Sequence, residues 1–469
     1  MSLPPSYDSA FDYFANALSF LEEFSWIYKT SNTKFIAEGV LEKFSPEWTQ
    51  YFTSADVEDL KNFPRGYNLV NFHTSGLILN SHDLKRYRER LKHLTPIHNV
   101  LEFLGSDMYI KGATPKKLHE ISRLSNVISR VCQDKVDIIV DFGSGLGYLS
   151  ELLYRENKFK ILGLECDTGR CKKAREKQEK NFISSKGEVF FKEALVTEQS
   201  SEFIADCVNE ICPKIENPKF AIVGLHACAD LSVTSLKLFL MMENAIKIIT
   251  MPCCYHKLKL SENSCTNNIF QNFPLSDVFS KAAEALKDSY KVLNRPFLRL
   301  ACQQTVSRWE DMSEQEHMRH GKEMFLRGAI ECLTQKNEFV SKRGKSFPPD
   351  ELNISNIEDV FNYVKSCYQL HKNESKMAIE WREEHKEILG KILSKYEFGE
   401  KLAEGLTCLQ TSLQELCENI VLLDRVCYMR ECCQKFNLNI NVFVQKITDD
   451  KISPRCFAFI AEKIEMPNS

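Results

Sequence analysis

The chain of 469 residues lacks the features of several protein classes. Its longest apolar stretch, residues 236–252, is interrupted by Lys237, Glu243 and Lys247, whereas a membrane span needs about 20 uninterrupted apolar residues. The opening MSLPPSYDSAFDYF has no basic start followed by an apolar run, so we expect no secretory signal. Its 18 cysteines are too sparse for a disulfide scaffold. We therefore expect no membrane association and a reducing compartment, the cytoplasm, with the nucleus as the alternative.

An excess of charge of one sign is also lacking. The formal net charge is -3 and the sequence pI is about 6.5, which gives no general footprint for nucleic acid, and we expect no DNA partner. A local basic groove is still compatible with these totals. Apolar residues make up 43% and charged residues 27%, the composition of a globular protein. The length suits one enlarged domain or two to three ordinary ones.

Short apolar segments alternate with helical stretches in the middle of the chain. The segments are residues 136–142, 160–166, 188–194, 219–227 and 245–252. This alternation predicts an α/β fold with a doubly wound, mostly parallel sheet that is covered on both faces. Two further apolar segments, 438–447 and 456–464, are joined by a short polar connection, which predicts an antiparallel pair.

The same pattern predicts four regions. Residues 1–110 form a helical N-terminal cap, and 111–309 form a core with the first five strands. Residues 310–430 are charged and mostly helical and form an insertion, and 431–469 form a strand hairpin that completes the sheet. Thr114-Pro115 predicts a helix start, because threonine caps helices and proline suits their first position.

The glycine-rich segment VDFGSGLGYLSELL (140–153) joins a predicted strand to a predicted helix, the junction at which α/β sheets bind nucleotides. The dinucleotide fingerprint G-x-G-x-x-G requires a third glycine where Tyr148 stands, and no Gly-Lys-Ser/Thr follows. Asp141 ends the strand and would repel a pyrophosphate, but it would favour a cationic ligand such as S-adenosylmethionine. A phosphate ligand and a purely structural corner are the alternatives.

A second acid supports a nucleoside ligand. Glu165 ends the second predicted strand, where a carboxylate can accept both hydroxyls of a ribose. Proteins that bind NAD use this position as well, so Glu165 discriminates only together with Asp141 and the glycine spacing.

Two segments rich in cysteine and histidine follow the fourth and fifth strands, GLHACADLS (224–232) and MPCCYHKL (251–258). Neither contains CxxC, and adjacent Cys253-Cys254 is a poor chelate, so we predict no metal. A cysteine such as Cys253 could attack a pyrimidine ring. Alternatively, Tyr255 stacks on a planar base while His226 or Asp230 orients or deprotonates the acceptor. The cysteines could also be small core residues.

Several segments together carry a resemblance to a known family. In chain order, they are TPKKLHEI (114–121), the glycine loop, GLHACADLS (224–232), PCCYHKL (252–258), LACQQTVSRW (300–309), LLDRVCYMRE (422–431) and SPRCFAFIAEK (453–463). This order is similar to that of the methyltransferase-like protein 25 family, over roughly residues 110 to 469. The CCYH segment also resembles the CCHH segment of transfer-RNA 2′-O-methyltransferases.

The resemblance implies a class I methyltransferase fold, a Rossmann-like sheet of seven strands that uses S-adenosylmethionine. It places His226, with Asp230, where the acceptor approaches the donor. The implied donor contacts are Asp141, Gly143, Ser144, Gly145, Gly147, Glu165, Glu193 and His226. The relation to ribosomal-RNA adenine dimethylases in the family's naming is not supported. Those enzymes carry an Asn/Asp-Pro-Pro-aromatic segment after the fourth strand, where this chain has HACAD.

We therefore predict an S-adenosylmethionine-dependent methyltransferase that modifies RNA at a base nitrogen or a ribose 2′-oxygen by direct in-line transfer. The alternatives are a protein or small-molecule methyltransferase, a cysteine-dependent pyrimidine C5 RNA methyltransferase, and a catalytically silent scaffold that binds the donor. A protein partner could dock on the cap or the insertion.

Overall fold

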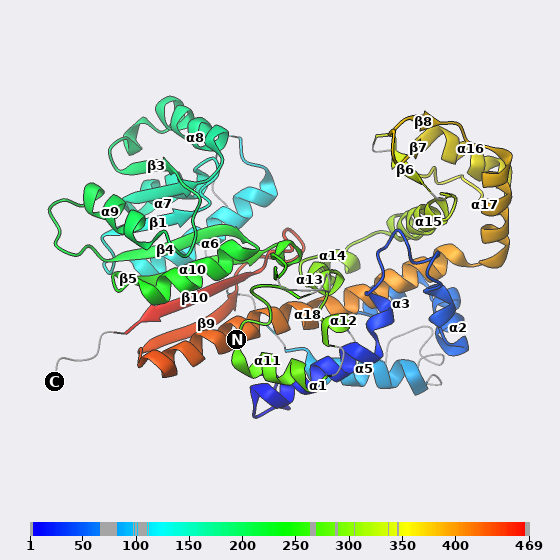
Figure 1. Ribbon diagram of the computed structural model, residues 1–469, viewed down its shortest axis with the longest axis horizontal. Coiled ribbons are helices and arrows are strands. Elements are labelled where there is room, and N and C mark those ends of the chain that lie inside the picture. Colours follow the sequence, from blue (N-terminus) through cyan, green and yellow to red (C-terminus); the bar gives the residue numbers. More distant parts are fainter. Residues whose placement is uncertain are drawn as a thin grey trace. The chain divides into compact units, whose positions relative to one another are not determined.

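The computed structural model describes residues 3–65, 82–96, 98, 101, 110, 112–262, 269–286, 289–303, 305–335, 337–344 and 347–464. The packing of the chain divides it into two units (Figure 1). We call residues 1–18, 95–303 and 416–469 the sheet unit, and residues 19–94 and 304–415 the second unit.

Seven strands form one mixed sheet in the sheet unit, in the order β3-β2-β1-β4-β5-β10-β9. They are β1 (Ile138–Phe142), β2 (Ile161–Glu165), β3 (Val189–Glu193), β4 (Phe220–Cys228), β5 (Ala245–Cys253), β9 (Ile440–Lys446) and β10 (Phe457–Lys463). Strands β1 to β5 run parallel, and β10 is antiparallel to both β5 and β9. All seven predicted strands are confirmed, and the sheet is that of a Rossmann-like class I methyltransferase fold.

Helices cover both faces of this sheet, which is why its strands are apolar on both sides. Successive residues of β1 alternate between two cores: Ile138 and Val140 pack into one, and Ile139 packs into the other. The first core receives α9 (Ser201–Ile211), α10 (Asp230–Met241) and the end of α18 (Gly399–Phe436). The second receives α6 (Pro115–Cys132), α7 (Tyr148–Asn157) and α8 (Thr168–Asn181).

Helix α6 begins at the predicted position. The Thr114 side chain accepts a hydrogen bond from the Lys117 backbone N–H at 3.3 Å, and Pro115 occupies the first helical position. The apolar stripe that includes Ile121 and Leu124 is fully buried against the sheet. This packing fixes the second turn of α6 beside the end of β4, which matters for the site.

The second unit combines parts of the predicted cap with parts of the predicted insertion. Its helices include α2 (Pro46–Ser54), α3 (Val57–Asn62), α5 (His82–Leu94), α14 (Val306–Glu310), α15 (Glu314–Glu331), α16 (Ile357–Cys367) and α17 (Glu383–Lys395). The buried Trp309 indole N–H donates to the Leu60 carbonyl at 2.9 Å, and the Gln410 amide donates to the Ile27 carbonyl at 2.9 Å. The two segments therefore fold together, although the four-region division itself stays a prediction.

The stretch predicted as mostly helical also contains a small antiparallel sheet, which the sequence argument did not anticipate. Its strands are β6 (Glu338–Lys342), β7 (Tyr368–Lys372) and β8 (Ala378–Ile379). Strand β6 lies at one edge of this small sheet. Its Val340 pairs in register with Leu370, and the Phe339 ring stacks on His371 at 4.9 Å between centroids, so contacts across the strands stabilise a segment that has few apolar residues.

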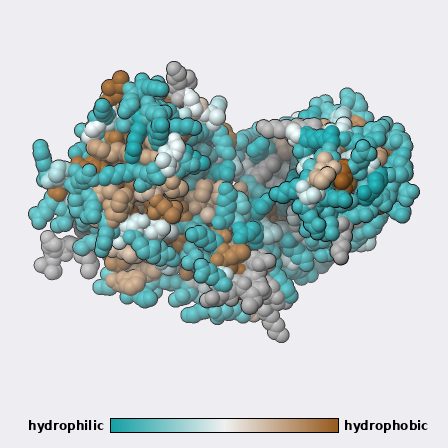
Figure 2. Space-filling view, turned by 45° about the horizontal axis from the view of Figure 1, so that its top comes forward, coloured by the Kyte–Doolittle hydropathy of each residue, from teal (hydrophilic) through white to brown (hydrophobic). Residues whose placement is uncertain are grey.

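Hydrophilic residues cover most of the face shown in Figure 2, and apolar residues gather on the part of that face that belongs to the sheet unit. Within the described ranges, every helix is too short or too polar to cross a lipid bilayer.

Candidate active site

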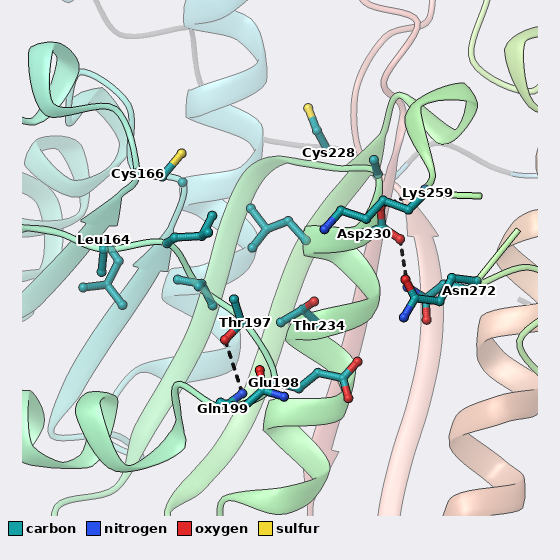
Figure 3. Close-up of a pocket in the computed structure, with 17 residues that line it drawn as sticks. Leu164, Cys166, Thr197, Glu198, Gln199, Cys228, Asp230, Thr234, Lys259 and Asn272 are labelled. Carbon is teal, nitrogen blue, oxygen red and sulfur yellow. Dashed lines mark hydrogen bonds between the residues drawn. The ribbon is translucent and has the colours of Figure 1, made fainter. Parts of the chain in front are cut away.

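A pocket with a volume of about 540 Å³ lies at the carboxyl ends of β1 to β4 (Figure 3). It is lined by Gly143, Leu164, Cys166, the segment 194–199, the segment 228–231, Thr234, Lys259, Gln271 and Asn272. Strand order reverses between β1 and β4, and doubly wound sheets bind their ligands at the carboxyl edge beside such a reversal. The side chain of Leu195 is 72% exposed, so it offers an apolar surface within this pocket.

The glycine loop after β1 lies beside this pocket and contributes Gly143 to its lining. Gly143, Gly145 and Gly147 have φ angles of 71°, 60° and 74°, a left-handed backbone that residues with a Cβ rarely adopt. A Cβ on Gly147 would also lie 2.4 Å from the Phe191 ring. The buried Ser144 hydroxyl oxygen has no hydrogen-bond partner among the described residues. The loop therefore presents a bare backbone and one unsatisfied hydroxyl.

Asp141 is more enclosed than the sequence argument assumed. It is 1% exposed, and its Oδ2 accepts a hydrogen bond from the Ser150 hydroxyl at 2.8 Å. Burial is the main cause that raises the pKa of Asp141 to about 7; the Ser150 hydrogen bond lowers the pKa and the charge of Glu165 raises it further. Asp141 is thus a buried group whose charge is incomplete near neutral pH, and an adjacent cation would complete the ionisation.

The two acids at the ends of β2 and β3 lie side by side, since Glu165 and Glu193 are partners in the strand register. Glu165 is buried, and its two carboxylate oxygens accept from the backbone N–H of Gly145 at 2.9 Å and of Asp167 at 3.0 Å. Glu193 is exposed and accepts from the Thr168 hydroxyl at 2.7 Å. Glu165 therefore holds the glycine loop in place, a contact that the sequence analysis did not predict.

Asp230 begins α10 and lines the pocket (Figure 3). Its Oδ1 accepts from the Asn272 side-chain amide at 2.8 Å, and its Oδ2 accepts from the Lys259 backbone N–H at 3.0 Å. These bonds fix the carboxylate and leave lone pairs free for a ligand. Its predicted role in orienting or deprotonating an acceptor stays a prediction.

His226 makes a contact that sequence reasoning missed. Its Nε2 lies 3.1 Å from the Glu120 carboxylate, and its side chain is 35% exposed. Glu120 comes from α6, is 1% exposed, and also accepts a hydrogen bond from the Ser453 hydroxyl. Burial would raise the pKa of Glu120, but the hydrogen bonds from His226 and Ser453 hold that pKa below its ordinary value.

The segment TPKKLHEI contained the only sequence signal for Glu120, but the sequence did not show whether Glu120 and His119 are exposed or buried. Both Glu120 and His119 are buried, and His119 Nε2 accepts from the Asp449 backbone N–H at 3.1 Å. Although His226 is well ordered by Glu120, it is not among the described residues that line the pocket. The predicted site residues are therefore grouped around the same sheet edge but do not all face one cavity.

Three residues with side chains adopt the left-handed conformation near this edge. His226, Ala229 and Cys254 have φ angles of 59°, 49° and 53°. The pairing of β4 with β5 also shifts register between Gly224 and Ala227. Such backbone strain costs about 1–3 kcal/mol per residue and concentrates at functional sites, which supports a functional role for the ends of β4 and β5.

Two residues that the sequence placed in the acceptor pocket are buried. Tyr255 is 1% exposed, its hydroxyl lies 3.5 Å from Glu418, and the Arg425 guanidinium lies 5.0 Å from its ring centroid. The predicted stacking on a base needs an open ring face, which this ring does not offer, because α18 covers it. Cys253 is 2% exposed, and hydrogen bonding to Cys228 is the main cause that raises its pKa. This environment does not suit an attacking thiolate.

Residues 116–261 match the family model described as "Methyltransferase domain". The chain carries a methyltransferase domain. The matched residues run from the first turn of α6 to just beyond β5. The methyltransferase domain therefore includes the glycine loop, Asp141, Glu165, and the ends of β4 and β5.

Two curated relatives are similar to about half of this chain. They are the probable methyltransferase-like protein 25 of Mus musculus, 25% identical over 254 residues, and that of Homo sapiens, 25% identical over 248 residues. Each match covers 52% of this chain, but only 37% and 36% of the relatives. The chain thus matches little more than a third of the length of these relatives. The predicted resemblance to this family is confirmed.

A solved structure is also similar, but only remotely. It is magnesium protoporphyrin IX methyltransferase from Synechocystis PCC 6803 with bound SAH, at 14% identity and a TM-score of 0.22, covering 37% of this chain and 68% of that chain. Similarity at this level is too low to support an argument about the reaction.

Proposed function

We propose that this chain is an S-adenosylmethionine-dependent methyltransferase that transfers a methyl group directly to RNA, at a base nitrogen or a ribose 2′-oxygen. The observation that carries the proposal is that the methyltransferase domain contains the pocket edge with the left-handed glycine loop. The acids at the ends of β1 and β2 beside this loop suit a cationic nucleoside ligand better than a diphosphate.

The residues present fit such a donor. S-adenosylmethionine, when bound, supplies a methyl group on a positively charged sulfonium. The bare glycine loop and the unsatisfied Ser144 hydroxyl would hold its amino-acid part, and Asp141 would favour its ammonium group. Glu165 retains lone pairs for the ribose hydroxyls beyond its two backbone bonds, and Glu193 would lie beside the adenine edge.

His226 is the proposed proton acceptor. With Glu120 ionised, the 3.1 Å contact places the N–H of the imidazole on Nε2 and leaves Nδ1 as the acceptor. Once His226 has taken a proton, the Glu120 carboxylate stabilises the imidazolium. In other enzymes, too, a histidine takes the proton while a carboxylate orients the imidazole and stabilises its charged form. Oxygen and nitrogen acceptors both need such a proton acceptor at some stage.

RNA as the acceptor is supported by the family resemblance and by local positive charge. Lys257 and Lys259 follow β5 and are exposed, and Lys116 and Lys117 lie in the first turn of α6. The net charge of -3 instead favours a protein or small-molecule acceptor. Salt separates the two possibilities, since affinity for RNA should fall steeply as salt displaces phosphate contacts. A cytoplasmic location and a protein partner on the predicted cap or insertion are further parts of this proposal.

The experiment that tests the function incubates the purified full chain with methyl-labelled donor and fractionated cellular RNA and protein. We expect label in the RNA fraction, and His226→Ala should reduce its incorporation by a factor of about 10² to 10⁴ while donor affinity is retained. His82→Ala is the matched control, because that histidine is exposed and lies in the second unit.

Label in the protein fraction alone would exclude RNA as the acceptor and leave the methyltransferase assignment intact. Equal label incorporation by the His226→Ala and His82→Ala variants would remove His226 from the mechanism.

A further inference from the structure

Three thiols meet where β4 and β5 end. Cys228 is the last residue of β4, Cys253 is the last residue of β5, and Cys254 follows. The three sulfur atoms all lie within 4.8 Å of one another, and those of Cys228 and Cys253 are 3.1 Å apart. Cys228 and Cys253 are partners in the strand register, so the fold itself, and not a flexible loop, brings these two thiols together.

The backbone at Cys254 explains how two adjacent cysteines can face one point. Consecutive side chains of a strand point to opposite faces of the sheet, which is why the pair Cys253-Cys254 looks unsuitable as a chelate in the sequence. Cys254 instead has a φ of 53°, a left-handed conformation that costs about 1–2 kcal/mol for a residue with a Cβ. This turn places its sulfur on the same side as that of Cys253. The folded chain thus removes the spacing argument against a metal.

The distances suit a soft divalent cation. Zinc–sulfur bonds of about 2.3 Å in a tetrahedron place the sulfur atoms about 3.8 Å apart. This separation lies between the 3.1 Å that joins the Cys228 and Cys253 sulfurs and the 4.8 Å within which all three sulfurs lie. The Arg455 guanidinium lies near the Cys254 thiol. Three thiolates around a divalent cation carry one net negative charge, which this guanidinium would balance.

We infer that Cys228, Cys253 and Cys254 form a binding site for a thiophilic divalent cation of the zinc type, with three thiolate ligands and a fourth position open to solvent or to a ligand. Binding converts three thiols to thiolates and releases their protons to the solvent. Three protein ligands with one exchangeable position distinguish reactive zinc sites from closed structural ones. Cys228 lines the pocket (Figure 3), so the open position is within reach of the pocket. The inference does not depend on the proposed methyl transfer.

The first test measures zinc by mass spectrometry in the full chain, purified under reducing conditions without chelators and after exposure to zinc. We expect about one tightly held zinc per chain, retained in Cys166→Ser and lost in Cys228→Ser and Cys254→Ser. Cys166 is the matched control, because it lines the same pocket but lies outside the three-thiol cluster. Wild-type protein without bound zinc, or with a Cys228–Cys253 disulfide under these conditions, would overturn the inference.

Cobalt substitution keeps the inference testable if the serine variants do not fold. Titration of the wild-type chain with Co²⁺ should produce a sulfur-to-cobalt charge-transfer absorption that saturates at one equivalent and disappears when zinc is added. In a separate sample of the cobalt-loaded chain without zinc, added imidazole should shift the visible bands, because it enters the open position. Saturation without sulfur-to-cobalt absorption would contradict thiolate ligation, and bands that are insensitive to imidazole would contradict the open position.

Discussion

The end of β1 and the ends of β4 and β5 are neighbouring parts of one sheet edge, and they use left-handed backbone differently. After β1, all three left-handed positions are glycines, which adopt this conformation without a steric penalty. After β4 and β5, the left-handed residues His226, Ala229 and Cys254 all carry side chains, at about 1–2 kcal/mol each.

The difference indicates what each part of the edge contributes. The glycine loop needs only its backbone, because a ligand must approach closely there. Two of the three strained residues at the other part have side chains with chemistry of their own: His226 contacts Glu120, and Cys254 belongs to the three-thiol cluster. Strain retained at residues that glycine could replace is evidence that the side chains are needed.

The largest expected effect is a loss of stability caused by a substitution in the glycine loop after β1. Gly147→Ala adds a Cβ 2.4 Å from the Phe191 ring, at a φ of 74°, so we expect the free energy of unfolding to fall by about 4 kcal/mol. Gly187→Ala is the control, because its φ is 90° with open space around it, and we expect a loss of about 1 kcal/mol there. Denaturant titration measures both values. Equal losses would mean that the contact with Phe191 does not restrict this position.

The second expected effect concerns pH and Asp141. Its folded-state pKa near 7 lies above the ordinary value of 3.8, mainly because of burial. The folded chain therefore binds this proton more tightly than the unfolded chain, and the resulting stability is present below about pH 4 and lost as pH rises through 7. Relative to Asp141→Asn, wild-type protein should lose about 3 kcal/mol of unfolding free energy between pH 4 and pH 7.5. Parallel pH profiles for the two proteins would contradict this burial.

The third expected effect concerns the strained part of the edge. Glu120→Gln keeps the shape but removes the charge beside His226, and we expect methyl incorporation to fall by a factor of about 10 to 100. Incorporation should be followed across pH, because loss of an orienting carboxylate shifts the pH profile whereas a general loss of folded protein only scales it. Glu216→Gln, at an exposed position, is the control and should match wild type. An unshifted profile for Glu120→Gln would exclude the orienting role.

The smallest expected effect comes from exchanging residue types between the two parts. Ala229→Gly should raise the free energy of unfolding by about 1 kcal/mol, because glycine relieves the strain at a φ of 49°. Gly143→Ala should lower it by about the same amount, because it creates that strain at a φ of 71°. Thermal unfolding of the two variants in parallel provides the measurement. Changes of the same sign would mean that the backbone angles do not govern stability here.

The sequence predicted the parts of the molecule that are encoded by neighbouring residues. All seven strands of the sheet are short segments rich in apolar residues, and the glycine loop with Asp141 lies within one strand–turn–helix unit. The start of α6 was readable from Thr114-Pro115 for the same reason. Local propensity and periodicity suffice in these cases.

Contacts between distant segments could not be predicted from the sequence. The pairing of His226 with Glu120 requires α6 to pack beside the end of β4. The burial of Tyr255 requires the middle of α18 to cover it, and the three-thiol cluster requires the register of β4 and β5. In each case the partners are brought together by the tertiary fold, which residue spacing does not reveal.

The central claim is that the sheet edge binds a cationic nucleoside donor. Isothermal titration of the full chain with S-adenosylmethionine, and separately with NAD and with ATP, tests it most directly. We predict saturable binding of S-adenosylmethionine at one site per chain, weakened as pH falls below 7 because Asp141 takes up its proton, and no binding of NAD or ATP at this site. Binding of NAD or ATP in place of S-adenosylmethionine would contradict the account.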